Sequence, residues 1–420
     1  MFTKDMSLYE VGIIGIGRVG LPLALSLNKN GISTLGFDIN KSLIDSVNKK
    51  IMPFQEDGYN EILKNSDFEA TDDFLRLKNV ENIIITVGTP LLAHIETDLT
   101  QINVVLNSIM AYLKPNHNII LRSTVAPKTT DYVHKYIESK TNFKVGKNIF
   151  LSFCPERIAE GKALIELESL PQIIGSLDKE SGRKAELIFS KLTSKFFHTN
   201  YISAELVKLF NNTYRYINFS ISNHFAMISE DFGVSIHEII EMANTDYPRS
   251  EIPLPGLTAG TCLRKDFGMI NETSSYSDLL LNSWKVNEFM PKFLVESVLK
   301  NFDIFDKTIG ILGYSFKKDS DDSRDSLVPK LIRYINREVP KQIFIHEPHI
   351  NGKLDEKYEN TNLNILIKES DIIFLALNHT IFKSNINTII KKSKDKCIFI
   401  DLWNISEKNK IIFKKNNINA

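Results

Sequence analysis

The sequence has few cysteines, no surplus charge and no long hydrophobic run. Its 420 residues include three cysteines, Cys154, Cys262 and Cys397, which form no CxxC or His-rich pattern. A disulfide framework and a metal site are therefore not expected, and this usage is typical of a reducing cytoplasm. Lys plus Arg and Asp plus Glu both number 51, so neither a nucleic acid nor a membrane surface is expected to bind by charge alone. The apolar run from Val11 to Ile16 is too short, and too interrupted by glycine, to be a signal peptide or a membrane span.

The chain is long enough for two or three domains, and it contains one stretch near its middle that predicts a long helix. From Ser203 to Glu230 there is no Gly or Pro, and apolar residues recur every three to four positions. Ser203 is the expected N-cap and Gly233 the expected stop. The apolar positions are Leu206, Leu209, Phe210, Thr213, Ile217, Ile221, Phe225 and Ile228. The opposite face carries Lys208, Asn212, Arg215 and Asn223, which form either a solvated face or part of a site.

The N-terminal part carries a dinucleotide-binding pattern. A β-rich run, Tyr9 to Ile14, leads into a glycine turn and a helix, and a second strand, Ser33 to Phe37, ends in Asp38. The turn consists of Gly15, Ile16, Gly17, Arg18, Val19 and Gly20. Its glycines allow a tight turn, close approach of a pyrophosphate and close helix–strand packing, and the helix N-terminus favours the phosphates. Asp38 can accept hydrogen bonds from both ribose hydroxyls and would repel a 2′-phosphate, so NAD is favoured over NADP.

Three further apolar runs predict buried strands of a parallel sheet that is covered on both faces: Asn82 to Val87, Asn118 to Arg122 and Asn148 to Phe153. Small or polar residues follow each run. They are Thr89 and Pro90, Ser123 and Thr124, and Glu156 and Arg157. Ligands of open α/β sheets bind beyond the carboxyl ends of the strands, so these residues are expected to contribute to one site.

A free cysteine follows a loop of small residues in the segment from Pro255 to Asp266. Arg264, Lys265 and Asp266 come soon after Cys262. Neighbouring positive charge favours the thiolate, which is the nucleophilic form. A buried structural thiol is the alternative, and the residues alone leave both readings open.

The last third of the chain predicts a second βαβ domain without a full GxGxxG. Its strands are expected after Lys307 and at Gln342 to Ile345, Asp371 to Ala376 and Cys397 to Ile400. Phe316 and Lys317 follow the first of them and suit a base and a phosphate, so a nucleotide-like ligand is reasonable. A solvated charged loop is the alternative for Asp319 to Asp325.

Together these motifs resemble the UDP-glucose/GDP-mannose dehydrogenase family, and the match covers nearly the whole chain. The matching segments are Gly15 to Gly20, Thr89-Pro90, Ser123 to Val125, Pro155 to Arg157 with Glu160-Gly161, Glu205 to Asn212, Gly260 to Asp266, and Phe316-Lys317 with Asp322 and Arg324. The resemblance implies an α/β protein of two Rossmann-like, doubly wound parallel-sheet domains joined by a long central helix. It implies an NAD domain over 1–200, a helical dimerisation region with catalytic residues over 201–300, and a nucleotide-sugar domain over 301–420.

The resemblance also implies a cytoplasmic enzyme that oxidises the C6 alcohol of a UDP-sugar in two NAD-dependent steps. Cys262 would capture the intermediate aldehyde as a thiohemiacetal, which becomes a thioester and is hydrolysed to the carboxylate. The remaining implied roles are an electrostatic stabiliser (Lys208), a neutral donor (Asn212), a group that positions water or shuttles protons (Asp266), a general base (Glu156) and a residue that helps to hold water (Thr124).

The binding residues are carried over in the same way. Those for the cofactor are Gly15, Ile16, Gly17, Arg18, Val19, Gly20, Asp38, Thr89, Pro90, Ser123, Thr124, Glu160 and Arg324. Those for the substrate are Arg157, Lys208, Asn212, Arg249, Gly260, Phe316 and Lys317, with Arg249 expected near the substrate site of the second copy in a homodimer. The cysteine loop is one residue shorter than the commoner form, and Ala259 stands where a glycine is more usual, so the resemblance does not define the loop's sugar contacts. His224 stands where many relatives have Glu.

The sugar is the least specific expectation. Relatives that act on UDP-glucose or GDP-mannose usually have an apolar residue at the position of Arg157, whereas relatives that act on UDP-N-acetylhexosamines have Arg. We therefore expect UDP-ManNAc or UDP-GlcNAc as the substrate, for a surface polysaccharide, with UDP-glucose as the alternative. Two other classes stay open: a single-step hydroxyacid dehydrogenase, which needs no cysteine, and a nucleotide sensor without catalysis.

Overall fold

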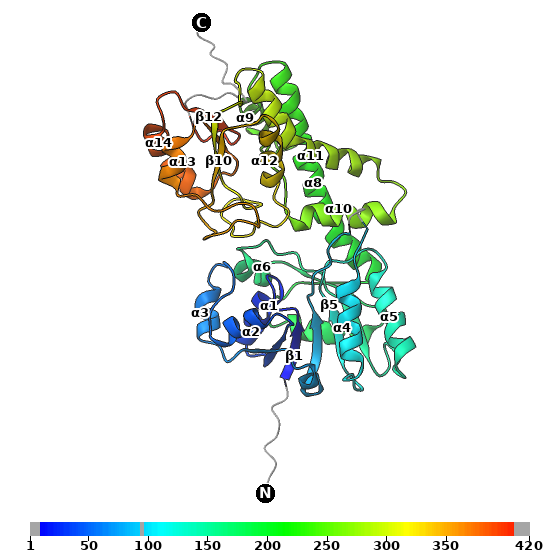
Figure 1. Cartoon of the computed structure of the whole chain (residues 1–420). Coiled ribbons are helices and arrows are strands. Elements are labelled where there is room, and N and C mark those ends of the chain that lie inside the picture. The colour runs from blue at the N-terminus through cyan, green and yellow to red at the C-terminus, as the bar shows by residue number, and fades with distance from the viewer. Residues whose placement is uncertain (1–8, 93–95, 407–420) are drawn as a thin grey trace. The chain divides into compact units, whose positions relative to one another are not determined.

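The computed structural model describes residues 9–92 and 96–406 (Figure 1). The chain divides into two compact units, each with its own sheet. The first unit holds the chain up to Asn211 together with Gly268–Ser275, and the second holds Asn212–Phe267 and the chain from Tyr276 onward. The expected division at 200 and 300 stays a prediction, and its outer ends, 1–8 and 407–420, lie outside the described residues.

The first unit is built on an eight-stranded sheet in the order β3-β2-β1-β4-β5-β6-β7-β8. The neighbours are parallel except for β6 and β7, which are antiparallel. The strands are β1 (Tyr9–Ile14), β2 (Thr34–Phe37), β3 (Glu69–Thr71), β4 (Val80–Ile85), β5 (Asn118–Leu121), β6 (Phe150–Phe153), β7 (Gln172–Gly175) and β8 (Phe196–Thr199). The five predicted strands are present, β1 with the predicted ends and the other four with shifted ends, whereas β3, β7 and β8 were not predicted.

Unbroken apolar strands allow both faces of this sheet to be covered, because successive side chains point to opposite faces. Ile84 packs in a cluster with one group of helices, while Ile83 and Ile85 pack with another. The first group is α1 (Gly20–Lys29), α2 (Lys41–Asn48), α3 (Tyr59–Lys64), α6 (Ala163–Ser169) and α7 (Lys179–Phe189). The second is α4 (Thr100–Met110) and α5 (Thr129–Lys140), which lie on the other side of the sheet in Figure 1.

The second unit has a four-stranded, fully parallel sheet in the order β10-β9-β11-β12. The strands are β9 (Thr308–Leu312), β10 (Gln342–His346), β11 (Ile372–Leu375) and β12 (Ile398–Asp401). Ile372 and Phe374 face a cluster with α9 (Ile236–Asn244), α11 (Asp278–Leu299) and α12 (Val328–Arg337). Ile373 and Leu375 face α13 (Leu363–Glu369) and α14 (Thr380–Lys392). The predicted class, two Rossmann-like domains with a long helical region between them in sequence, is confirmed.

The predicted long helix is α8, which spans Tyr201–Asp231 and contains 31 residues. It starts before Ser203, so the prediction that Ser203 is the N-cap is wrong. Asn200 has that role instead, because its side-chain oxygen accepts the Ser203 N–H at 2.8 Å. Gly233 adopts a left-handed φ of 69° just beyond the helix, as expected for a stop signal.

The buried and exposed sides of α8 do not coincide with the predicted apolar and polar faces. In the predicted polar row, Asn212 and Asn223 are buried and Arg215 is exposed. In the predicted apolar stripe, Ile221, Phe225 and Ile228 are 41–42% exposed. The core side of α8 therefore contains hydrogen-bonding side chains, which a hydrophobicity pattern cannot place. Among the described helices, including α8, none has the length and apolar character needed to span a membrane.

Candidate functional site

The glycine turn after β1 is shaped to receive a diphosphate. Gly15 has a φ of 91°, and a Cβ on Gly20 would lie 2.0 Å from the Gly15 carbonyl oxygen, so neither position tolerates a side chain. A Cβ on Gly17 would meet nothing within 4 Å. The space beside Gly17, at the N-terminus of α1, is thus open to an anion that backbone N–H groups and the helix dipole would stabilise.

Asp38 lies beside this turn, directly after β2. One carboxylate oxygen accepts the Ile16 N–H at 3.0 Å, and the other accepts the Asn40 N–H at 2.9 Å. These two bonds fix the carboxylate beyond the carboxyl ends of the strands, where the ribose of a dinucleotide lies in this type of fold. The residues at the turn therefore fit NAD.

The other predicted cofactor residues of the first unit follow the next strands. The Thr89 hydroxyl donates to the Thr124 carbonyl oxygen, and the Ser123 hydroxyl donates to the Val87 carbonyl oxygen at 2.7 Å. These bonds tie the segments after β4 and β5 together. Pro90 follows Thr89 and is exposed.

Arg18, in the glycine turn, forms an ion pair with Glu160 at 2.5 Å, so two predicted cofactor residues far apart in sequence are brought together. Arg324 lies in the second unit, where its guanidinium binds both carboxylate oxygens of Asp322.

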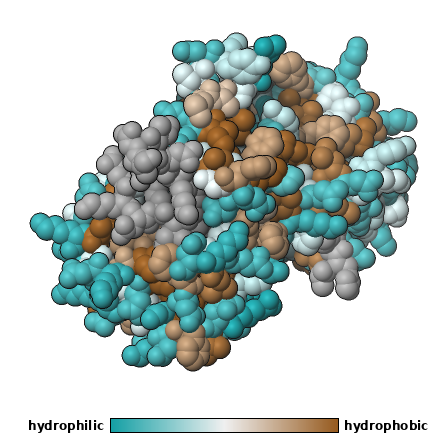
Figure 2. Space-filling model, turned by 90° about the horizontal axis from the view of Figure 1, so that it is seen from above, coloured by the Kyte–Doolittle hydropathy of each residue, from teal (hydrophilic) through white to brown (hydrophobic). Residues whose placement is uncertain are grey.

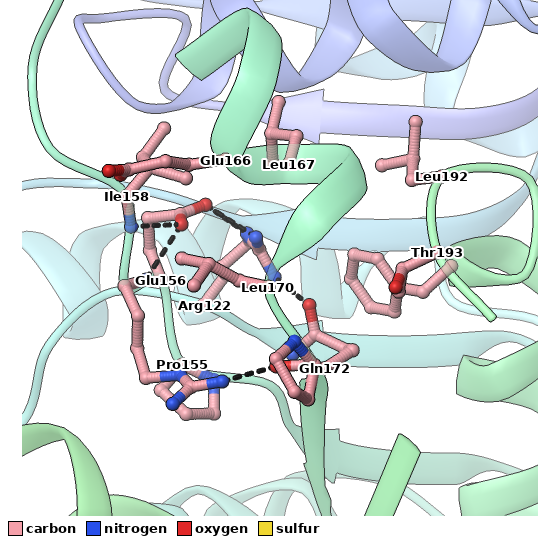
Figure 3. Close-up of a pocket in the computed structure, with 13 residues that line it drawn as sticks. Arg122, Pro155, Glu156, Ile158, Glu166, Leu167, Leu170, Gln172, Leu192 and Thr193 are labelled. Atoms are coloured by element: carbon pink, nitrogen blue, oxygen red, sulfur yellow. Dashed lines mark hydrogen bonds and ion pairs between the residues drawn. The ribbon is translucent and has the colours of Figure 1, made fainter. Parts of the chain in front are cut away.

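Glu156, the predicted general base, lies in a buried ion pair (Figure 3). One oxygen accepts the N–H groups of Arg157 and Ile158 at 2.7 and 2.9 Å, and the other accepts the Arg122 Nε–H at 2.8 Å. Arg122 also donates to the Gln172 side-chain oxygen at 2.9 Å. Glu156 thereby anchors the turn after β6. Sequence reasoning missed Arg122, because its partner is 34 positions away.

Arg157, on which the expected sugar rests, donates a hydrogen bond to the Pro171 carbonyl oxygen before β7. Burial lowers the pKa of its guanidinium from the ordinary value.

Glu205, within the matched segment of α8, fastens the start of this helix to α5. Its carboxylate accepts the N–H groups of Lys128 and Thr130, both at 2.8 Å, and the Thr130 hydroxyl at 2.6 Å. Burial raises the pKa of Glu205. Lys208 follows one turn later on α8, so Glu205 sets the position of the helix segment that carries Lys208.

Cys262 lies in the first turn of α10 (Thr261–Thr273) and its side chain is exposed. The sequence did not indicate that a helix begins at Thr261. Burial raises the pKa of the Cys154 and Cys397 thiols to about 12 in both cases, so they stay protonated at neutral pH. Cys262 is therefore the accessible cysteine.

Asp266 follows Cys262 by one helical turn and is fully buried. Its carboxylate accepts a hydrogen bond from the Asn212 side-chain amide at 2.6 Å. The structure thus joins two of the predicted catalytic residues, Asn212 of α8 and Asp266 of α10. Asn212 also lies one turn after Lys208 on α8.

The segment after β9 carries the predicted nucleotide contacts Phe316 and Lys317. The Phe316 N–H donates to the Asp322 carbonyl oxygen at 2.9 Å, which closes the segment into a compact loop. Gly260 packs against the Phe316 ring: it has a φ of 99°, and a Cβ there would lie 2.5 Å from the ring. Arg249 is exposed, with its guanidinium 4.9 Å from the Tyr247 ring centre.

Glu347 follows β10 as Asp38 follows β2, but it is fully buried. It accepts the N–H groups of Tyr314 and Ser315 at 2.7 and 3.0 Å and contacts His379 Nε2 at 3.1 Å. Burial opposes ionisation, but the bonds from His379 and the backbone outweigh it and lower the pKa of Glu347 to about 2. Sequence reasoning missed this carboxylate, which holds the turn after β9 instead of facing a ribose.

Asp319, His349 and His379 offer three possible metal-binding atoms within 4.8 Å of one another. Both ring nitrogens of His379 are engaged, however, because Nδ1 accepts the Asp319 N–H at 2.8 Å and Nε2 contacts Glu347. We therefore interpret this group as an anchor for the loop that contains Asp319 and not as a metal site.

Comparison with known proteins gives three family models that match in order along the chain. The NAD binding domain of the UDP-glucose/GDP-mannose dehydrogenase family matches residues 9–193, its central domain 202–288 and its UDP binding domain 310–408. The first match confirms the predicted cofactor, NAD. The third supports a UDP-containing ligand.

Individual relatives agree with these matches. The UDP-N-acetyl-D-mannosamine dehydrogenase of Pyrococcus horikoshii is 30% identical over 94% of this chain and 96% of that protein. The protein of the same name from Methanocaldococcus jannaschii is 31% identical over 94% and 92%. The solved structure of the UDP-D-ManNAc dehydrogenase from Pyrococcus horikoshii has a TM-score of 0.88 at 29% identity, over 96% of this chain and 97% of that one. The chain therefore belongs to the UDP-glucose/GDP-mannose dehydrogenase family and is an NAD-binding nucleotide-sugar dehydrogenase.

Proposed function

We propose that the protein oxidises the C6 alcohol of a UDP-N-acetylhexosamine to the carboxylate in two steps, with Cys262 as the covalent catalyst. The observation that carries this proposal is the placement of Cys262: an exposed thiol in the first turn of α10, one turn before a buried carboxylate, Asp266. A structural thiol would be buried, as Cys154 and Cys397 are.

The chemistry balances with two equivalents of NAD, which when bound accepts one hydride in each oxidation. The first oxidation converts the alcohol to an aldehyde and releases a proton. The Cys262 thiolate adds to the aldehyde carbon to give a thiohemiacetal, which loses the second hydride to become a thioester. Water then attacks the thioester, releasing the carboxylate and returning the thiol.

The other residues have roles that suit their surroundings. Lys208 stabilises the developing oxyanion, and Asn212 is a neutral donor whose amide is oriented by Asp266. Asp266 shuttles protons or positions the water. Thr124 helps to hold the water, and Glu156 acts as general base in the hydrolysis. Because the carboxylate of Glu156 is bonded to Arg122 and to two backbone N–H groups, its service as a base requires that it leave part of this network.

For the substrate, the UDP binding domain match and the names of the relatives at about 30% identity support a UDP-N-acetylhexosamine, with UDP-ManNAc first. UDP-GlcNAc and UDP-glucose are the competing substrates. The uronic acid product would serve a glycosyl-transfer reaction that builds a surface polysaccharide.

A panel of UDP-ManNAc, UDP-GlcNAc, UDP-glucose and GDP-mannose, assayed for NADH formation, tests the substrate. A site that hydrogen-bonds an N-acetyl group loses on the order of 100-fold in kcat/KM when that group is missing. We expect an N-acetylhexosamine to exceed UDP-glucose by about that factor. A preference for UDP-glucose or GDP-mannose would refute the N-acetylhexosamine assignment but leave the family assignment unchanged.

We also propose that the protein is a homodimer formed around α8. In the second unit this helix exposes Tyr214, Ile221, Phe225 and Ile228, of which Tyr214 is 68% exposed. These positions are three, four or seven apart and so follow one side of the helix. A continuous apolar strip of this kind is typical of a protein interface. On the face of the molecule shown in Figure 2, hydrophobic atoms likewise form patches within a largely hydrophilic surface.

Light scattering at micromolar concentration is expected to give about twice the chain mass of 47.9 kDa. Replacing Ile221 and Phe225 together by Glu places two carboxylates in the interface, which weakens association by on the order of 100-fold or more. Ile381→Glu on α14 is the matched control. Ile381 is similarly exposed, at 48%, and this variant should stay dimeric. A monomeric wild-type protein under assay conditions would contradict the dimer.

The role of Arg249 near the partner's substrate site follows from the same proposal. Arg249→Ala and Cys262→Ala are each expected to be inactive. Mixing them gives heterodimers with one complete site, so activity should return to about a quarter of the wild-type value if subunits exchange randomly. No recovery in a mixture shown to contain heterodimers would place Arg249 outside the partner's site.

A further inference from the structure

The segment that carries Cys262 is joined to the nucleotide loop, Phe316–Asp325, on both sides of the cysteine. Before it, the Gly260 N–H donates to the Asp325 carbonyl oxygen at 3.2 Å, and Gly260 packs on the Phe316 ring. After it, Arg264 Nη1 lies 3.3 Å from a carboxylate oxygen of Asp325. Cys262 therefore sits between two attachments to the same loop.

Arg264 also attaches α10 to α11. Its Nε lies 2.8 Å from a carboxylate oxygen of Glu288, and the other oxygen of Glu288 lies 2.7 Å from Lys330 of α12. Glu288 is 8% exposed, so this part of the cluster is shielded from solvent. The cluster contains two cations, Arg264 and Lys330, and two carboxylates, Glu288 and Asp325, so its charges balance. Arg264 is the member that contacts both carboxylates.

The nucleotide loop is held together by hydrogen bonds and an ion pair between its own residues. The Phe316 N–H is bonded to the Asp322 carbonyl oxygen, and the Asp322 carboxylate is bonded to the N–H and guanidinium of Arg324. Asp325 follows with a φ of 53°, a left-handed conformation that is uncommon for most non-glycine residues but tolerated by Asp. The bond from Gly260 to its carbonyl oxygen and the ion pair of its carboxylate with Arg264 help to hold it there.

We propose that Arg264 is a positioning residue that couples occupancy of the nucleotide loop by a nucleoside diphosphate to the placement of Cys262. This inference rests on the proposed function, because it takes the loop with Phe316 and Lys317 as the UDP contact. When the loop closes on the nucleotide, Asp325 moves with it, and Arg264 transmits this movement to the first turn of α10. The chain thus uses its nucleophile fully only when the nucleotide part of the substrate is in place.

The test is the rate at which iodoacetamide alkylates Cys262, measured by peptide mass spectrometry with and without UDP. UDP lacks the hexose, which is the part of the substrate that could cover the thiol. In wild-type protein we expect UDP to speed alkylation about fivefold, the lower end of the range for coupled sites, because it brings Cys262 into the placement used in the reaction. In Arg264→Gln the ratio with and without UDP should fall to about one. Arg264→Lys, which keeps the charge but not the two-sided contact, should restore part of the effect.

Two measurements accompany the rates. Calorimetric titration with UDP shows whether each variant still binds the nucleotide, and thermal unfolding shows whether Arg264→Gln remains folded. Arg183→Gln is the matched control: Arg183 is 57% exposed and paired with Glu180 on α7, and its loss should leave the UDP effect unchanged.

The outcomes separate the two proposals. If the wild-type protein binds no UDP, the proposed function fails and this inference fails with it. If UDP changes the alkylation rate equally in wild type and Arg264→Gln, whether by speeding it or by shielding the thiol, the coupling role of Arg264 is refuted. If UDP leaves the wild-type rate unchanged although it binds, coupling is absent and the inference is refuted while the substrate proposal stands.

Discussion

Cys262→Ser protein supplied with UDP-sugar and NAD is expected to release a burst of no more than about two equivalents of NADH per site and then stop, with the sugar still attached. The serine would form an ordinary ester in place of the thioester. An ester is a poorer acyl electrophile, so its hydrolysis becomes very slow while the hydride transfers remain possible. Intact-protein mass spectrometry after incubation should show the adduct.

Cys262→Ala should lose the overall oxidation without any adduct, because no nucleophile is left to capture the aldehyde. Cys397→Ser is the matched control: Cys397 is 5% exposed, and its replacement should cost some stability but keep turnover. If either Cys262 variant sustains turnover to the uronic acid, the covalent mechanism is wrong.

A large effect is also expected when NAD is replaced by NADP. The wild-type enzyme should prefer NAD to NADP by on the order of 100-fold in kcat/KM, because a 2′-phosphate placed beside the Asp38 carboxylate costs about 3 kcal/mol. Both carboxylate oxygens of Asp38 are held by backbone N–H groups, so the side chain cannot easily turn away.

Asp38→Asn removes the charge but keeps an acceptor for the Ile16 N–H, and it should reduce the preference to about tenfold or less. Asp57→Asn, at an exposed position of the same unit, removes an equal charge and should leave the preference unchanged. Comparable kcat/KM for both cofactors in the wild-type enzyme would remove Asp38 from the role assigned to it.

Much of the fold could be predicted because its signals are local. Each central strand is an unbroken apolar run. The turn from Gly15 to Gly20 has glycine where a positive φ or close packing excludes a side chain, so the glycine spacing marks the turn in the sequence. Strand β8 could not be predicted in this way. β8 lies at the edge of the sheet, and its residues Phe197 and His198 are exposed, so no buried pattern marks it.

The candidate site was harder to predict, because its geometry depends on pairs that are distant in sequence. Nothing near Glu156 indicates that Arg122 neutralises it, and nothing near Glu347 indicates His379. The polar row of α8 shows the same limit: its residues suit a solvated face equally well until Asn212 is seen bonded to Asp266. Residue type and spacing indicate which groups are available, whereas burial and partners decide what they do.

A four-electron oxidation at one site is tested by the stoichiometry of NADH against sugar. A limiting amount of the preferred UDP-sugar is converted to completion by the wild-type enzyme with excess NAD, and the product is identified by mass spectrometry. We expect two NADH per sugar and a uronic acid, with no aldehyde released at any time. One NADH per sugar, with a free aldehyde as the product, would contradict the four-electron oxidation.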